Sequence, residues 1–188
     1  MTVKTDMSRF HIHDELTAPE GSVKILKGIQ TAGAAVSKFI GVLAGSAPAL
    51  RAYARMRHEI RSGVLSEQTR ERIALAVAEH RGDAYSMAHH GRSALAVGLD
   101  LDEVSKARNF ASGDEREDAL LTLLAELLRG DGRPKTHLVE ETRECGWSDE
   151  EILEAISQLA LCEFESLISN AAALPLDQTD RSILPAAA

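Results

Sequence analysis

Apolar residues along this chain recur at intervals of three and four, which is the spacing of amphipathic helices. The run Ile73–Ala78 is apolar on all sides, which predicts a central helix buried over most of its surface. Between residues 114 and 129 leucines gather on one helical face. No segment reads as a strand, so the pattern predicts an all-α fold.

Capping residues, glycines and prolines divide this pattern into about eight helices joined by short loops. Pro48 suits the first turn of a helix, Ser66 and Asp83 are N-cap residues, and Ser148 with Glu151 forms a capping box. The predicted helices cover residues 22–43, 48–61, 66–80, 83–97, a short stretch from Asp100 or Asp102, 114–129, a segment up to 145, and 148–173. We expect an arm over 1–21, one helical domain over 22–178 and a tail over 179–188.

The arm shows no periodicity and carries His11 and His13 beside Asp14 and Glu15. These residue types make a metal-binding arm conceivable. The favoured interpretation is an arm that packs on a neighbouring subunit or stays disordered.

The composition narrows the classes of function. The 188 residues carry a net charge of −8, without a cluster of Lys and Arg, which argues against a nucleic-acid partner. No apolar run reaches the length of a membrane span, and residues 1–20 lack the apolar core of a signal peptide, so we expect a cytoplasmic protein. Cys145 and Cys162 are not spaced as C-x-x-C, and we expect two buried, unpaired thiols.

The segment from Glu71 to His90 concentrates the candidate chemistry. Glu71 is expected in the first turn of an apolar helix, and Asp83 opens the next one after Gly82. Ser86 and His90 stand four residues apart and therefore share a helical face. Taken singly, Asp83 is an ordinary N-cap, Glu71 a favourable acid at a helix start, and a single histidine more often a hydrogen-bonded core residue than a catalyst.

Glu163 is the second anomaly. By angle it falls, with Asn170, inside an apolar stripe of Ile152, Ile156, Leu159, Ala160 and Leu167. A buried carboxylate points to a functional site, and a subunit interface explains it equally well.

A metal site has weaker support. His80, His89 and His90 are ligand types, but no recognised metal spacing such as H-E-x-x-H occurs. We expect no metal and no other cofactor.

The segment resembles the central motif of the AhpD-like alkylhydroperoxidase and carboxymuconolactone decarboxylase superfamily. Redox members carry a Glu, then C-x-x-C, then a His four residues after the second Cys. Here Glu71 precedes Asp83 by twelve residues as in the family, Asp83 and Ser86 occupy the two cysteine positions, and Tyr85 and His90 match the motif. The resemblance covers roughly residues 40–178 and implies an AhpD-like helical bundle that assembles as a homotrimer or homohexamer.

The resemblance implies a proton relay of Glu71 and His90 without its thiols. A serine hydroxyl forms no disulfide, so two-cysteine peroxidase turnover is not expected. Three hypotheses follow: non-redox acid–base chemistry on a small organic substrate, with Glu71, Ser86 and His90 catalytic and Asp83, Tyr85 and Glu163 holding the substrate; an inactive relic that serves as a ligand-binding or structural oligomer; or a His-rich metal-binding site.

Overall fold

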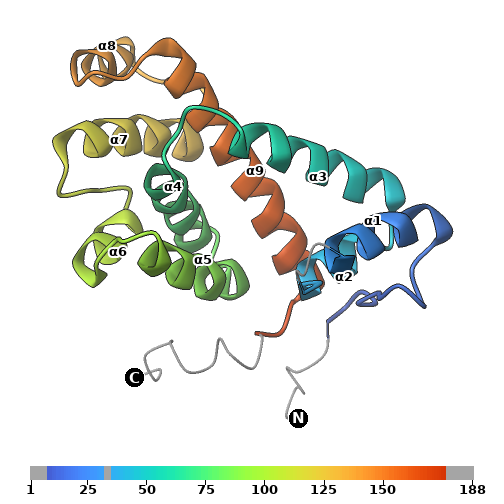
Figure 1. The fold of residues 1–188 in the computed structure, drawn as a ribbon. Helices are drawn as coiled ribbons and strands as arrows, with labels where there is room; N and C mark the ends of the chain where they lie inside the picture. Colours follow the sequence, from blue (N-terminus) through green and yellow to red (C-terminus); the bar gives the residue numbers. More distant parts are fainter. Residues whose placement is uncertain (1–7, 32–34, 177–188) are drawn as a thin grey trace. The chain divides into compact units, whose positions relative to one another are not determined.

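The computed structural model describes residues 8–31 and 35–176. Within these ranges the chain is helical without strands, which confirms the all-α prediction (Figure 1). The described helices are α1 (Glu20–Thr31), α2 (Lys38–Leu43), α3 (Ala47–Arg61), α4 (Glu67–His80), α5 (Ala84–Ala96), α6 (Leu101–Ala107), α7 (Glu115–Arg129), α8 (Thr136–Glu144) and α9 (Asp149–Ala172). None of them is long and apolar enough to cross a membrane.

The prediction of one helix over 22–43 is wrong. α1 ends at Thr31, residues 35–37 are not helical, and α2 begins at Lys38. The extended backbone of Ser37 starts α2, because its side chain accepts a hydrogen bond from Ile40 N at 3.3 Å. Two helices therefore replace the single one expected.

The described part of the N-terminal arm packs on its own chain. Arg9 N donates to Ala172 O at 2.7 Å, and His13 N donates to Gly41 O at 2.9 Å. A Cβ on Gly41 would lie 2.6 Å from a methyl carbon of Ile12, so this contact needs glycine. Residues 8–13 thus make defined contacts within their own chain. Residues 1–7 and the expected tail, 179–188, lie outside the described residues.

The chain divides into two compact units, one within Met1–Glu59 and Leu167–Ala188 and the other Ile60–Ser166. In the first unit, α2 meets α3 through the rings of Phe39 and Tyr53, whose centroids are 5.1 Å apart. The second unit holds α4 to α8, the first part of α9 and every residue of the candidate motif.

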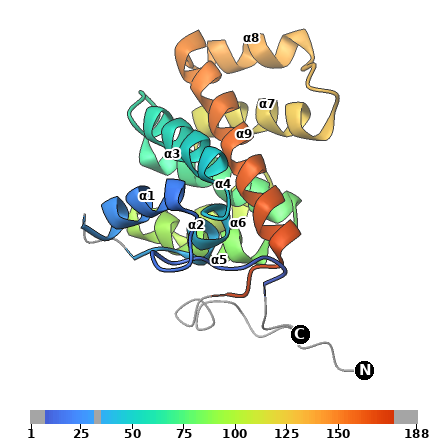
Figure 2. The same ribbon diagram turned by 90° about the vertical axis from the view of Figure 1, so that its right-hand side faces the viewer.

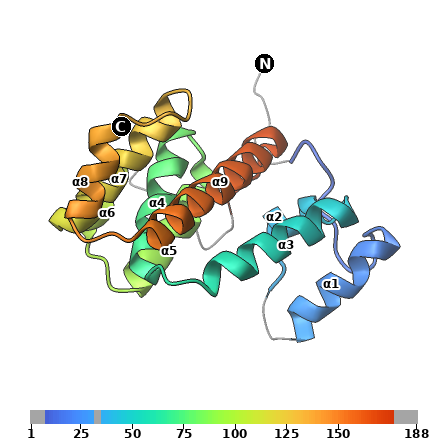
Figure 3. The same cartoon turned by 90° about the horizontal axis from the view of Figure 1, so that it is seen from above.

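α4 lies at the centre of the second unit's core. Residues Ile73 to Ala78 are at most 1% exposed, which confirms the prediction of a central buried helix. The core also takes in Leu120, Leu121, Leu123 and Leu124 of α7, and Ile152, Ala155, Leu159 and Cys162 of α9. Figure 3 shows the first part of α9 passing α4.

α8 lies beside α7 (Figure 2). Thr142 on α8 donates from Oγ1 to Leu138 O at 2.7 Å and is fully buried. Trp147, just after α8, donates from Nε1 to Arg116 O on α7 at 2.6 Å. The Trp147 bond fixes the chain that leads into α9 against α7.

The buried side of α9 differs from the predicted stripe. Its buried residues include Ile152, Ala155, Leu159, Cys162 and Ser166, spaced by three and four. Ala160, Leu167 and Asn170 are exposed, and Leu167 is 68% exposed. The observed stripe is rotated about the axis of α9 relative to the predicted one. A different carboxylate of the helix therefore faces inward.

The turn between α4 and α5 places the candidate motif. Gly82 has φ +59°, a conformation that side-chain-bearing residues rarely adopt. Asp83 N then donates back to Ala78 O at 2.8 Å, and α5 starts one residue later. α4 and α5 therefore pack against each other as a helical pair.

Candidate functional site

Glu71 on α4 and His90 on α5 form the centre of the site. His90 Nδ1 donates to Glu71 Oε2 at 2.8 Å. Their side chains are 20% and 14% exposed, so the pair is largely shielded yet reachable from solvent. The structure thus brings together the two residues that the sequence motif separates by nineteen positions.

Glu165 on α9 approaches the other ring nitrogen of His90. Its Oε2 lies 3.9 Å from His90 Nε2, and its side chain is 14% exposed. Glu165 was not among the predicted site residues, because the predicted stripe puts Glu163 on the inward face. The spacing of three from the buried Cys162 was the available signal.

The two carboxylates control the charge of His90. Burial by itself lowers the pKa of His90, but the interactions with Glu165 and Glu71 outweigh it and raise the pKa from 6.5 to about 9. His90 is therefore an imidazolium at neutral pH.

Asp83 and Ser86 form the start of α5. Asp83 is 2% exposed, and its Oδ1 accepts from Ser86 N at 3.1 Å, which confirms its capping role. Its other oxygen, Oδ2, is buried without a hydrogen-bond partner. Ser86 and Tyr85 are each 8% exposed. Among the hydrogen bonds of the described residues, none joins Ser86 to His90, so these two do not form a nucleophile–base pair here.

Glu163 lies away from the relay contacts. It is half-buried and pairs with Arg81, whose Nε donates to Glu163 Oε1 at 2.7 Å and whose Nη2 donates to the other oxygen. The predicted position of Glu163 inside the buried stripe is thus only partly met, and the salt bridge at the end of α4 supplies the partner that such a carboxylate needs.

The two cysteines differ from each other. Cys162 is 3% exposed, as expected, whereas Cys145 is only half-buried. Burial, with the charges of Glu165 and Glu71, raises the pKa of the Cys162 thiol well above its usual value. Cys162 thus lies near the relay but stays protonated, which makes it a poor nucleophile.

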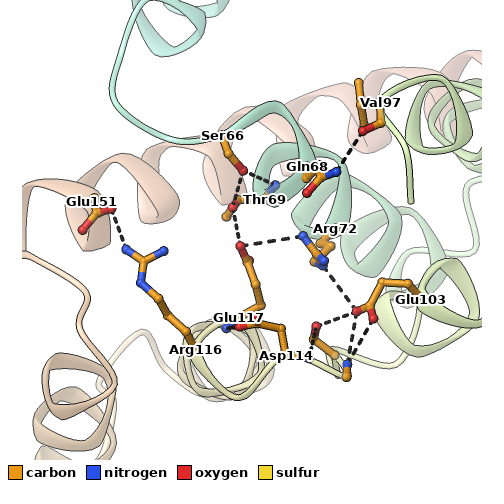
Figure 4. Close-up of polar contacts among 12 residues, drawn as sticks. Ser66, Gln68, Thr69, Arg72, Val97, Glu103, Asp114, Arg116, Glu117 and Glu151 are labelled. Atoms are coloured by element: carbon orange, nitrogen blue, oxygen red, sulfur yellow. Dashed lines mark hydrogen bonds and ion pairs between the residues drawn. The ribbon is translucent and has the colours of Figure 1, made fainter. Parts of the chain in front are cut away.

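A buried polar cluster anchors the start of α4 (Figure 4). Arg72 follows Glu71 in the sequence and is 7% exposed. Its Nε lies 3.4 Å from Glu103 Oε1 on α6, and its Nη1 lies 3.7 Å from Glu117 Oε1 on α7. Thr69 Oγ1 donates to Glu117 Oε1 at 2.7 Å. The cluster fixes the helix from which Glu71 projects.

Residues 8–31 and 35–176 contain no group of three His, Cys, Asp or Glu side chains placed to hold a metal ion. His89 is exposed, and its ring meets that of His90 edge-on at 5.0 Å.

Comparisons with known proteins find one family match and several solved structures of similar fold. Residues 47–129 match the carboxymuconolactone decarboxylase family. The match covers less than half of the chain. A comparison with curated proteins finds no match.

Solved structures share the fold over nearly the whole chain. A peroxidase-related protein from Silicibacter sp. TM1040 has 20% identity and a TM-score of 0.77, covering 95% of this chain and 96% of its own. A second, an AhpD-core protein from Ralstonia eutropha JMP134, has 17% identity and a TM-score of 0.78, covering 93% and 94%. A cysteine-to-alanine variant of the debrominase Bmp8, in complex with 2,3,4-tribromopyrrole, has 16% identity and a TM-score of 0.73, covering 94% and 97%.

Proposed function

We propose that this protein performs non-redox acid–base chemistry on a small organic substrate, with Glu71 and His90 as its proton-transfer residues. The observation that carries the proposal is the 2.8 Å bond between Glu71 Oε2 and His90 Nδ1 in a largely buried setting. A carboxylate on Nδ1 fixes the imidazole ring and leaves Nε2 to exchange protons with a substrate.

The residues around α5 support a substrate nearby. Ser86, Tyr85 and Asp83 line the start of that helix, and Asp83 keeps one buried carboxylate oxygen without a protein partner. We assign these three to substrate positioning. Glu163 could contact a substrate only if its salt bridge with Arg81 broke, so its role in substrate binding has the least support of the four.

The residues of the site support redox chemistry less than acid–base chemistry. Positions 83 and 86 carry no thiol, and the one cysteine near the relay has a raised pKa. The debrominase of the same fold was crystallised with a small halogenated pyrrole, which supports a small organic molecule as the substrate class.

The assembly and location of the protein are further proposals. We expect a homotrimer or homohexamer in the cytoplasm. Leu101 and Leu153 are 74% and 64% exposed, and burial of such side chains at an interface favours association.

A substrate screen tests the proposal. Purified protein is incubated with small lactones and small carboxylic acids that can lose CO₂, and consumption is followed by NMR. We expect turnover of a member of this set, reduced about 100-fold or more in His90→Asn and unchanged in His137→Asn, an exposed control on α8. Consumption of peroxide with a dithiol reductant by the wild-type protein would contradict the non-redox assignment.

A further inference from the structure

Both ring nitrogens of His90 face a carboxylate. Glu71 Oε2 lies 2.8 Å from Nδ1, and Glu165 Oε2 lies 3.9 Å from Nε2. The two acids come from different helices, α4 and α9, so each is positioned independently of α5. His90 therefore has two carboxylates beside its ring, one more than a histidine that is held by a single acid.

The second carboxylate changes which protonation state is favoured. With Glu71 alone, a neutral imidazole would donate from Nδ1 and present a lone pair at Nε2, which is the form of a general base. A lone pair pointed toward the Glu165 carboxylate is repulsive, whereas an N–H at Nε2 is attracted to it. Glu165 thus favours the form with a proton on both nitrogens.

The remaining groups near His90 do not offset this effect. On α5 the His89 ring contacts that of His90 edge-on, and on α9 the Cys162 thiol is protonated. Arg81, at the end of α4, is paired with Glu163. The raised pKa of His90 agrees with a site in which the two carboxylates dominate.

We infer that Glu165 is a positioning residue that keeps a proton on Nε2 of His90, so that His90 acts as a general acid and not as a base. This inference rests on the proposed acid–base function and narrows its reaction class. The substrate would be one in which a bond breaks and leaves an electron pair on the substrate.

The proton balance of such a step is simple. In the loss of CO₂ from a carboxylate, the carbon–carbon bond breaks and its electron pair stays on the substrate carbon. That carbon takes the proton from Nε2, and His90 becomes neutral. His90 then regains a proton from water, and no oxidant or reductant is needed.

Titration of His90 in the Glu165→Gln variant tests the inference without a substrate. Gln keeps the shape of the side chain and removes its charge. The ring signals of His90, assigned by their loss in His90→Asn, are followed by NMR against pH. We expect the wild-type midpoint to lie near a pKa of about 9 and to fall by about one unit or more in Glu165→Gln.

Glu150→Gln is the matched control, since Glu150 is an exposed carboxylate on the same helix, and it should leave the midpoint unchanged. Glu165→Asp should restore part of the shift. Once a substrate is known, the high-pH limb of its rate profile should move down by the same amount in Glu165→Gln.

Two results would overturn the inference. One is a wild-type His90 midpoint below about 7, close to that of an unperturbed histidine. The other is a Glu165→Gln midpoint equal to that of the wild type. If Glu165→Gln does not fold, the wild-type titration still tests the inference. Neither result depends on turnover, so failure of this inference can be told apart from failure of the proposed function. Failure of the proposed function would show as full activity in His90→Asn.

Discussion

At the scale of single residues, the chemistry of the site depends on which side chains the fold brings to His90. The sequence pattern was sufficient to select Glu71 and His90, and they form a hydrogen bond. It could not select Glu165, because that residue lies 75 positions further along the chain and its face depends on the rotation of α9. The two carboxylates Glu163 and Glu165 stand about 200° apart on the helix, so an error in the buried stripe exchanges their roles.

The state of Cys162 gives a prediction at this scale. Burial and neighbouring carboxylates raise the pKa of its thiol, so it should not react with a thiol reagent such as DTNB at pH 8 in the folded protein. We expect Cys162→Ser to leave the reactive thiol content of the native protein unchanged, while Cys145→Ser removes it. Rapid labelling of Cys162 before unfolding would show that the thiol is accessible and activated.

At the scale of elements, local sequence signals placed most helix boundaries. Ser66, Asp83 and Asp114 each accept a hydrogen bond at the helix start that they were expected to cap or open. The break before α2 escaped prediction because Ser37 sits inside a segment whose composition suits a continuous helix. The buried stripe of α9 also escaped, because burial there depends on which helices pack against it.

The polar cluster that anchors α4 gives a prediction at this scale. Arg72→Met leaves the half-buried carboxylates of Glu103 and Glu117 without the buried cation between them, which should cost about 3 kcal/mol of unfolding free energy. Urea denaturation measures this loss.

Arg55→Met is the matched control, since Arg55 pairs with Glu59 on the surface and its side chain is 79% exposed. It should change the unfolding free energy by less than about 1 kcal/mol. Equal effects of the two substitutions would mean that the buried cluster does not secure α4.

At the scale of the whole molecule, the fold is shared with solved AhpD-like structures. The charge on His90 links the site to overall stability. Folding raises the pKa of His90 from 6.5 to about 9. The protonation of His90 therefore contributes its full stabilisation of the folded state below pH 6.5, and this contribution is lost as the pH rises through 9.

The unfolding free energy should fall by up to about 3 kcal/mol across this window. Urea denaturation between pH 6 and pH 10 measures the fall, and His90→Asn should lack most of it. A wild-type protein whose stability changes no more than that of His90→Asn would show that His90 is not charged in the folded state.

The central claim is that Glu71 and His90 act as one proton-transfer unit. A double-mutant cycle tests it most directly, with turnover measured on the substrate found in the screen. The cycle compares Glu71→Gln, His90→Asn and the variant with both substitutions. If the residues form one unit, the double variant should be no slower than His90→Asn alone, which should lose about 100-fold or more. Losses that multiply, or turnover that survives in both single variants, would contradict the claim.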